Sequence, residues 1–493
     1  MKSSYQIGII GAGFGGMTAA LRLKESGEND FVIFERAEDL GGTWRDNQYP
    51  GCACDVPSHL YSFRNAPNPN WSEAFSTQPE IWKYMKQVAQ QNRLQEHIVY
   101  NAQIVSSVFK EETGRWQLTD KTGRTFDVKM LIAAIGPLNR PNIPPLKGLD
   151  TFRGTVFHSS QWDNSCNLEG KKVAVIGTGA SAIQIVPTIA PIVKDLTLFQ
   201  RTPAWISPRR NRKYLGLEKT LFKYLPFLQK LNRERIYWIS EFLGLNFLGN
   251  KLMNRLGTLQ ALSKLKKEVK DPEIRKKLTP NYTFGCKRIL LSDDYLPSFN
   301  RVNVHLVTEP IDHIEADGIV GKDGQKHEAE VIIFGTGFHA AGTDGFDMEV
   351  IGLKQCNLVK EWQQSGIQGF KGITVSGFPN LTFILGPNTG LGHTSVLHIM
   401  DSQMNYIIDY LHLLQKQGTK GYLDVQEQIQ RVYNEQLQSQ FAGTVWASGC
   451  QSWYLDAHGR NTTIYPGLTQ TYRKATQHID QKDYETVKGI SGK

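Results

Sequence analysis

Two glycine-rich segments of the same design stand far apart in this chain of 493 residues. The first, GAGFGG, begins at Gly11 directly after an apolar run at 7–10. A helical pattern of apolar residues follows, and then a second apolar run, FVIF, leads to Glu35. A strand, a glycine turn, a helix and a second strand ending in an acid form the dinucleotide-binding unit. The N-terminus therefore predicts a parallel α/β sheet of the Rossmann type.

The glycines of this first unit have separate physical roles. Gly11 makes the tight turn, and Gly13 lets the backbone approach a pyrophosphate at the positive N-terminus of the helix. Gly16 completes the motif, and Glu35 lies 19 residues further on. A carboxylate at that position accepts hydrogen bonds from a ribose diol and would repel a 2′-phosphate. This pattern indicates an FAD site.

The second unit repeats the design but changes its last residue. GTGASA supplies Gly177, Gly179 and Ala182, and the strand LTLF leads to Gln200 and Arg201. Arg201 follows Ala182 by 19 residues, so it takes the position that Glu35 holds in the first unit. An arginine there attracts a 2′-phosphate. The unit therefore predicts an NADPH site made by Gly177, Thr178, Gly179, Ala180, Ser181, Ala182, Arg201 and Thr202.

Two further segments, 130–144 and 330–340, each run from a strand through a glycine into a loop, as a crossing between domains would. They divide the chain into a first FAD-binding part at 1–144, an NADPH-binding domain at 145–335 and a completion of the FAD domain at 336–493. Periodic Leu, Phe, Tyr and Trp among Lys and Arg predict a helical insertion at 209–280. The expected fold class is α/β, with two Rossmann-type domains and this insertion.

Composition narrows the possible settings. No apolar run of about 18 residues appears, so no membrane-spanning helix is expected. The N-terminus enters the glycine motif at once, which leaves no room for a signal peptide. Six scattered cysteines suit a reducing compartment, and Cys52 and Cys54 have no partner cluster that would complete a metal site. We therefore expect a cytoplasmic protein without a metal.

The positive charge is concentrated in the insertion. The whole chain carries a formal net charge of +9, and residues 209–277 hold 18 Lys and Arg against 6 Asp and Glu. No nucleic-acid-binding motif accompanies this charge, so nucleic acid is not an expected partner. A soluble cap over the active site is the favoured interpretation. The alternatives are a solvated basic face and a peripheral membrane contact, with FLGLNFLGNKLM as its apolar side.

Two longer patterns resemble the Baeyer–Villiger monooxygenase family. In GGTWRDNQYPGCACD, the matching residues are Gly42, Trp44, Tyr49, Pro50, Gly51 and Asp55. In FRGTVFHSSQWD, the residues at the fixed positions of the family signature are Phe152, Gly154, His158, Trp162 and Asp163. The resemblance covers nearly the whole chain.

The resemblance implies an activity and a set of site residues. NADPH would reduce FAD, O2 would add at flavin C4a, and the peroxyflavin would insert one oxygen beside a ketone carbonyl to give an ester or lactone. Sulfides are a second substrate class. Arg288 would stabilise the anion, Asp55 would orient Arg288, and Lys287 and Trp453 would contact NADPH. The expected FAD site also takes in Phe14, Gly42, Thr43, Trp44, Asp55, Tyr61 and Ile104.

Three alternatives remain open at this point. A flavin enzyme that oxidises sulfur or nitrogen would share the cofactor motifs, but it typically lacks the Trp162–Asp163 pair. An NADPH-dependent reductase would need a redox CxxC, which the sequence does not contain. A dinucleotide sensor without turnover would not need Asp55 and Arg288. His158 has two interpretations as well, because it would either couple the domains or simply pack their junction.

Overall fold

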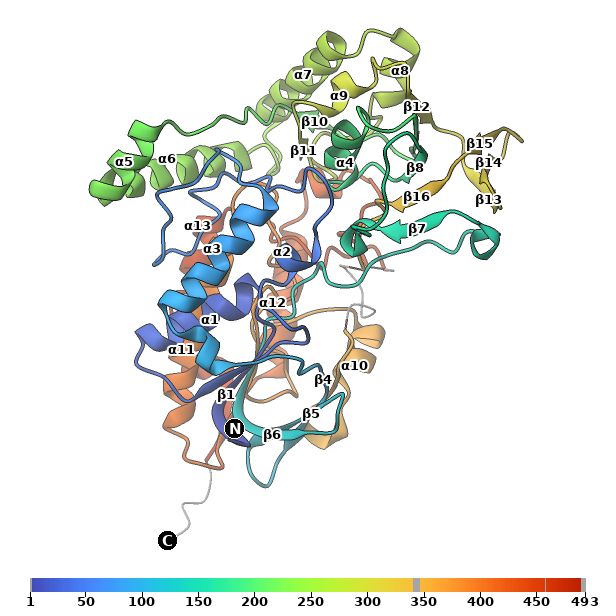
Figure 1. Cartoon of the computed structure of the whole chain (residues 1–493). Helices are drawn as coiled ribbons and strands as arrows, with labels where there is room; N and C mark the ends of the chain where they lie inside the picture. Colours follow the sequence, from blue (N-terminus) through green and yellow to red (C-terminus); the bar gives the residue numbers. More distant parts are fainter. Residues whose placement is uncertain (1, 340–345, 457, 489–493) are drawn as a thin grey trace.

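The computed structural model describes residues 2–339, 346–456 and 458–488, and Ala340, the last residue of the second crossing segment, lies outside them. The chain builds two main sheets, the first mixed and the second fully parallel, with helices packed around them (Figure 1). Strands near the N-terminus form the sheet at the bottom of the view, and strands from the middle of the chain form the sheet at the upper right.

The first sheet contains the strands that the first glycine motif predicted. Its order is β17-β4-β5-β6-β1-β2-β3, and β18 pairs with β6. Strands β1 and β2 are parallel, with Ile7 opposite Phe31. Ile7 and Ile9 of β1 and all four residues of β2 are buried, which explains the uninterrupted apolar runs of the sequence. Its strands are β1 (Ser4–Ile10), β2 (Phe31–Phe34), β3 (Ile98–Val99), β4 (Ile104–Lys110), β5 (Arg115–Asp120), β6 (Thr125–Ala133), β17 (Glu349–Ile351) and β18 (Leu381–Phe383).

The second sheet repeats the arrangement around the second glycine motif. Its order is β12-β9-β8-β16-β7, and every pairing in it is parallel. Its strands are β7 (Thr155–His158), β8 (Lys172–Ile176), β9 (Asp195–Phe199), β12 (Val304–Val307) and β16 (Val331–Phe334). Smaller sheets flank it, made of β10 (Ile206–Ser207) with β11 (Leu290–Leu291), and of β13 (Ile311–Glu315), β14 (Gly318–Gly321) and β15 (Lys326–Glu328). The α/β class with two Rossmann-like sheets is thus confirmed.

The two crossing segments lie side by side. The Asn142 N–H donates to the Gly337 carbonyl at 2.9 Å, and the His339 N–H donates to the Arg140 carbonyl at 3.0 Å. The chain therefore leaves the first sheet and returns to it through one paired connection. After the return, β17 and β18 join the first sheet, and β19 (Tyr422–Val425) pairs with β20 (Tyr484–Val487).

Helices cover both sheets. Those of the two nucleotide units and the C-terminal part are α1 (Phe14–Glu25), α2 (Thr43–Asp46), α3 (Gln78–Gln91), α4 (Ala182–Ile189), α9 (Tyr295–Ser298), α10 (Leu358–Ser365), α11 (Val396–Gln415), α12 (Glu427–Ser439) and α13 (Thr469–Ala475). The predicted insertion is helical: α5 (Gly216–Tyr224), α6 (Pro226–Gly244), α7 (Lys251–Glu268) and α8 (Pro272–Leu278). Figure 1 shows α5 and α6 projecting at the upper left and α7 at the top.

The signature FRGTVFHSSQWD is not only a connector. Its central residues form β7, an edge strand of the second sheet, where His158 lies opposite Phe334. The His158 side chain is completely buried, and its Nδ1 accepts the Ser160 N–H at 3.2 Å. The ring of Trp162 packs against Phe157, and Asp163 accepts the Ser165 N–H at 2.9 Å. These contacts favour the packing interpretation of His158.

Residues 49–55, which follow α2, dock onto helix α4 beside the second sheet. The Tyr49 hydroxyl donates to Gln184 Oε1 at 3.0 Å, and Gln184 Nε2 donates to the Ala53 carbonyl at 2.9 Å. Gly51 has a φ of +80°, and a Cβ there would collide with the Thr188 hydroxyl of α4. A glycine is therefore required where this loop packs against α4.

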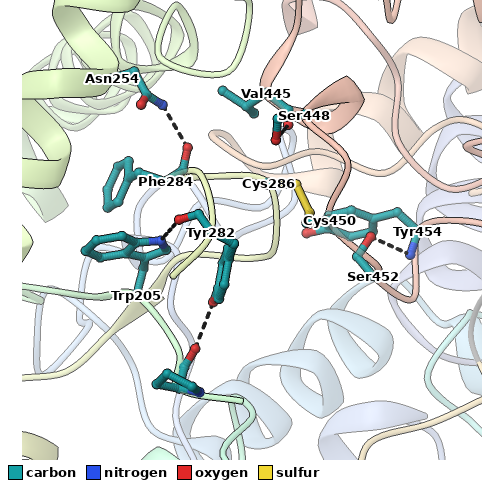
Figure 2. The surroundings of a disulfide bond; sticks show 11 residues. Trp205, Asn254, Tyr282, Phe284, Cys286, Val445, Ser448, Cys450, Ser452 and Tyr454 are labelled. Carbon is teal, nitrogen blue, oxygen red and sulfur yellow. Dashed lines mark hydrogen bonds between the residues drawn. A yellow bond between two sulfur atoms is a disulfide. The ribbon is translucent and has the colours of Figure 1, made fainter. Parts of the chain in front are cut away.

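A disulfide joins Cys286 to Cys450 across 164 residues (Figure 2). It ties the loop before β11 to the C-terminal segment that carries Trp453 and Tyr454. The scattered cysteines suggested a reducing compartment, in which free thiols are expected. Cys286 and Cys450 differ from that expectation, because they form a disulfide. Their separation in sequence hid the pairing, since only the fold brings the two Cα atoms to 6.3 Å.

This covalent link makes a direct prediction. The unfolded protein should show four reactive thiols without reductant, from Cys52, Cys54, Cys166 and Cys356, and six after reduction. Replacing Cys286 and Cys450 with serine should lower the free energy of unfolding by about 2–4 kcal/mol, because the unfolded chain regains freedom. Thiol titration and chemical denaturation measure both effects. Cys356→Ser is the control, and six thiols without reductant would contradict the link.

Candidate functional site

Three glycines shape the first nucleotide turn. Gly11 has a φ of +100°, and a Cβ there would lie 2.6 Å from the Ala134 carbonyl oxygen. A Cβ on Gly16 would collide with the carbonyl of Gly11. Gly13 faces Gly42 of the next turn, where a Cβ on Gly42 would lie 3.2 Å from the Cα of Gly13. The two turns thus leave a narrow cradle that side chains would fill.

Helix α1 begins at this cradle. Its N-cap is Gly13, and no side chain caps the first turn. The first backbone N–H groups are therefore left for an anion, which is the arrangement that binds pyrophosphate. The residues present here fit FAD.

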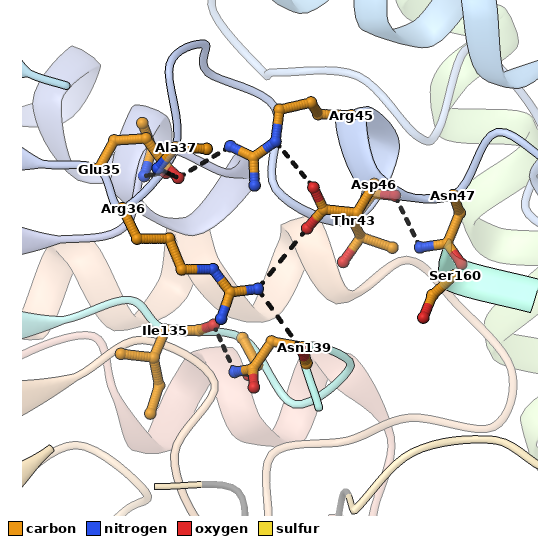
Figure 3. Close-up of polar contacts among 12 residues, drawn as sticks. Glu35, Arg36, Ala37, Thr43, Arg45, Asp46, Asn47, Ile135, Asn139 and Ser160 are labelled. Carbon is orange, nitrogen blue, oxygen red and sulfur yellow. Dashed lines mark hydrogen bonds and ion pairs between the residues drawn. The ribbon is translucent and has the colours of Figure 1, made fainter. Parts of the chain in front are cut away.

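Glu35 has more partners than the sequence suggested. Its Oε2 accepts the Ala12 N–H at 2.8 Å, and its Oε1 accepts the Ala37 N–H at 3.0 Å. Arg45 donates to Oε1 at 2.8 Å and to Asp46 at 2.8 Å (Figure 3). Since each carboxylate oxygen can accept two hydrogen bonds, Oε2 keeps one position for a ribose hydroxyl. Arg45 lies inside the GGTWRD motif, but nothing in the spacing marked it as the partner of Glu35.

Aromatic residues of the predicted FAD set pack together beside the cradle. The ring of Phe14 lies 5.0 Å from that of Tyr61, and the Trp44 indole N–H donates to the Tyr61 hydroxyl at 3.0 Å. Thr43 begins α2 directly after Gly42. Ile104 begins β4 and is buried in the apolar core with Val99 and Ala102. The structure therefore gathers Phe14, Trp44 and Tyr61 and places Ile104 in the core of the sheet.

The second nucleotide turn has the same construction. Gly177 has a φ of +111°, and a Cβ there would collide with the Gly335 carbonyl. Helix α4 begins at Ala182 after Ser181, whose side chain makes no capping bond. The Thr178 hydroxyl donates to the Thr202 carbonyl at 2.9 Å and holds the turn after β9 against the glycine loop. Residues 177–182 and 201–202 therefore meet at one end of the second sheet.

Two cations come together at this end. Arg201 is exposed. Burial lowers the pKa of Lys287, and the positive charge of nearby Arg201 lowers it further. The Lys287 ammonium also lies 4.9 Å from the ring centre of Tyr282. No carboxylate of the described residues pairs with Arg201 or Lys287. Two neighbouring cations without a counter-ion fit the 2′-phosphate of NADPH.

An ion pair links the two nucleotide-binding parts. Arg288 Nη2 lies 2.6 Å from Asp55 Oδ2, and Arg288 Nε donates to the same oxygen at 3.2 Å. Their side chains are 39% and 26% exposed, so the pair is only partly covered by other protein atoms. The sequence placed these residues together only through a family resemblance, because 233 residues separate them.

The pair stays ionised near neutral pH. Burial raises the pKa of Asp55, but the charge and hydrogen bonds of Arg288 outweigh burial and hold that pKa below its usual value. The negative charge of Asp55 in turn raises the pKa of Arg288 above its usual value. The pair therefore contributes stability above the ordinary carboxyl pKa, and that contribution is lost as pH falls through the lowered pKa of Asp55.

Two residues near this pair escaped the sequence analysis. Tyr454 is buried, and burial raises its pKa to about 12, while Arg288 lowers it and Asp55 raises it. Arg209 donates to the Cys54 carbonyl at 2.9 Å, next to Asp55. Neither residue stands in a recognisable spacing. Trp453, which the resemblance did single out, is 44% exposed, and its ring lies 4.5 Å from that of Tyr454.

Comparisons with known proteins agree with this geometry. The model of the flavin-binding monooxygenase-like family matches residues 4–354. A Baeyer–Villiger monooxygenase of Streptomyces coelicolor is 44% identical, over 98% of this chain and 93% of its own. A solved cyclohexanone monooxygenase from Rhodococcus sp. Phi1 bound to NADP+ superimposes with a TM-score of 0.87 at 26% identity, over 99% of this chain and 100% of its own. A solved complex of OTEMO with FAD and NADP also has a TM-score of 0.87 at 26% identity, over 98% of this chain and 99% of its own.

These matches span nearly the whole chain and include both nucleotide units. They confirm the expectation of a flavin monooxygenase that uses FAD and NADPH, which the two glycine turns predicted. They also confirm the family resemblance that the two longer motifs indicated. The chain belongs to the flavin-binding monooxygenase-like family and, within it, to the Baeyer–Villiger monooxygenases.

Proposed function

We propose that Arg288 and Asp55 form the catalytic centre at which this enzyme converts a small ketone and O2 into an ester or lactone. The observation that carries this assignment is the Arg288–Asp55 pair, in which a carboxylate from a distant part of the chain holds a guanidinium in place. The names of the relatives support ketone oxygenation in general. They do not define the ketone, so the substrate is proposed only as a class.

Each partner in the pair has its own role. FAD, reduced by NADPH, supplies the activation of O2 when it is bound. The Arg288 guanidinium keeps its positive charge at any working pH and stabilises negative charge that develops on oxygen beside it. Asp55 accepts two hydrogen bonds from Arg288 and so holds the guanidinium in one orientation. A cation fixed before the reaction need not reorganise during it.

The other assigned residues bind and position the cofactors. The first glycine turn, with Glu35 and the aromatic group around Tyr61, holds FAD. The second turn, with Arg201 and Lys287, holds NADPH, and Trp453 covers its nicotinamide end. With these assignments, residues 1–144 and 336–493 together form the proposed FAD-binding domain. Residues 145–335 form the proposed NADPH-binding domain.

Two competing activities fit the site less well. An S- or N-oxidising enzyme would use the same cofactors, and sulfides remain a second proposed substrate class. A disulfide reductase would need a reactive dithiol beside the flavin. Cys52 and Cys54 are buried as free thiols, and burial raises the pKa of Cys52 to about 12, which suppresses the reactive thiolate.

Replacing Arg288 tests the proposed centre. Arg288→Ala should retain FAD but form about 100-fold less ester per NADPH, since a preorganised charge is lost. NADPH should then be consumed with release of hydrogen peroxide. Arg288→Lys keeps the positive charge but cannot make both hydrogen bonds to Asp55. Its ester yield per NADPH should therefore lie between that of the wild type and that of Arg288→Ala. Product analysis with a ketone panel, alongside peroxide measurement, gives the result, and normal ester yield in Arg288→Ala would refute the assignment.

Replacing Arg201 tests the coenzyme site. Arg201→Ala should raise the KM for NADPH by about 10- to 100-fold, because a charged hydrogen bond contributes about 1.5–3 kcal/mol. The KM for NADH should change little. Lys194→Ala is a matched control, since Lys194 precedes β9 at its other end and is also exposed. Equal effects of Arg201→Ala on both coenzymes would place the phosphate elsewhere.

A further inference from the structure

The helical insertion exposes most of the large apolar side chains that this protein leaves uncovered. Among the described residues, 20 large hydrophobic side chains are exposed, and 14 of them lie between Leu215 and Leu259. Single exposed apolar residues are ordinary on a protein surface, whereas a concentration of this kind marks an interaction site.

The exposed residues follow the helical repeat. On α5 they are Leu217, Leu221 and Tyr224; on α6 they are Phe227, Leu231, Trp238 and Phe242; on α7 they are Leu252, Leu256 and Leu259. Spacings of three, four and seven residues place each set on one side of its helix. Each helix therefore carries an apolar stripe that the rest of the protein does not cover. We call the stripes of α5 and α6, two helices that adjoin each other, the apolar face of the insertion.

Helix α6 shows most clearly that this exposure is built into the fold. Its inner side docks through polar groups: Arg233 donates to the His59 carbonyl at 2.7 Å, and Gln229 donates to the Asn68 carbonyl at 2.8 Å. Glu241 is buried and accepts the Thr469 N–H at 3.1 Å. Trp238 and Phe242 point the other way and are 52% and 59% exposed. The usual polarity of a surface helix is thus inverted.

Exposed basic side chains stand on the same three helices of the insertion. Lys223, Lys230 and Arg235 are exposed on α5 and α6, and Lys251, Arg255, Lys266 and Lys267 are exposed on α7. None of these seven forms an ion pair within the described part of the chain. Apolar stripes with aromatic residues and unpaired cations on the same helices fit the boundary between anionic headgroups and acyl chains.

We propose that the apolar face of the insertion binds peripherally to an anionic lipid bilayer. Trp238, Phe227, Phe242 and Tyr224 would enter the headgroup boundary, and the lysines and arginines of these helices would meet lipid phosphates. None of the described helices is long and apolar enough to cross a membrane, so the contact is with the surface only. A second copy of the chain is a poorer occupant, because a symmetric contact would bring like charges together.

The exposed stripes favour the peripheral membrane contact, one of the alternatives that the sequence left open, over the soluble cap over the active site that the sequence favoured. Composition and charge were visible in the sequence, but the direction of each stripe was not. Helix α6 mixes Leu, Phe and Trp with Lys, Arg and Glu, so either side could have faced the protein. The contacts of Arg233, Gln229 and Glu241 decide which side does.

Vesicle co-sedimentation of the purified holoenzyme tests the proposal. The protein should bind vesicles that contain phosphatidylglycerol, bind pure phosphatidylcholine far more weakly, and lose affinity as salt rises. Trp238→Gln combined with Phe242→Gln should weaken binding at least tenfold, because two exposed aromatic anchors of α6 are lost. Flavin content, melting temperature and vesicle-free ketone turnover should not change, since these side chains contact neither nucleotide site.

Matched variants separate this surface from the rest of the protein. Ile192→Gln removes a side chain that is 50% exposed outside the insertion, and it should leave vesicle binding unchanged. Lys223→Glu combined with Lys230→Glu should weaken binding to phosphatidylglycerol vesicles by at least tenfold. No binding to these vesicles would overturn the proposal, as would equal binding by the aromatic variant. A concentration-dependent dimer that the aromatic variant abolishes would assign the face to a second copy instead.

Discussion

The Arg288–Asp55 ion pair is the interaction on which the proposed chemistry depends. Asp55 ends the YPGCACD stretch in the proposed FAD part, and Arg288 lies in the loop that leads into β11 in the proposed NADPH part. Neither part could build this site alone. The position of the guanidinium is therefore set by how the two parts dock, and the contacts of residues 49–55 with α4 fix that docking.

Other connections converge on the same region. The Cys286–Cys450 link lies one residue before Lys287 and two before Arg288, and it holds the segment that carries Tyr454 and Trp453. Arg209 bridges to the Cys54 carbonyl from the start of the insertion. Loops from distant parts of the sequence are thus tied to a common point, as the catalytic role proposed for Arg288 requires.

Much of this arrangement could be predicted from local patterns. The two glycine turns have fixed spacing because a nucleotide imposes it, and so β1, β2, β8 and β9 appeared where the sequence placed them. Contacts between remote residues could not be predicted in this way. Three such features depend on the folded arrangement: the Cys286–Cys450 disulfide, the hydrogen bond from Arg45 to Glu35, and the position of His158 in the edge strand β7. The inverted polarity of α6 was hidden because its residue mixture fits either orientation.

A double-mutant cycle on the ion pair tests the account most directly. The ester yield per NADPH would be measured for the wild type, Asp55→Asn, Arg288→Ala and the double variant, with FAD content checked in each. If Asp55 acts by holding Arg288, Asp55→Asn should already lose most of the yield, and the double variant should be little worse than Arg288→Ala. The effects would then be non-additive by about 1–3 kcal/mol. Additive effects, or a normal yield in Asp55→Asn, would contradict the claim that the pair acts as one unit.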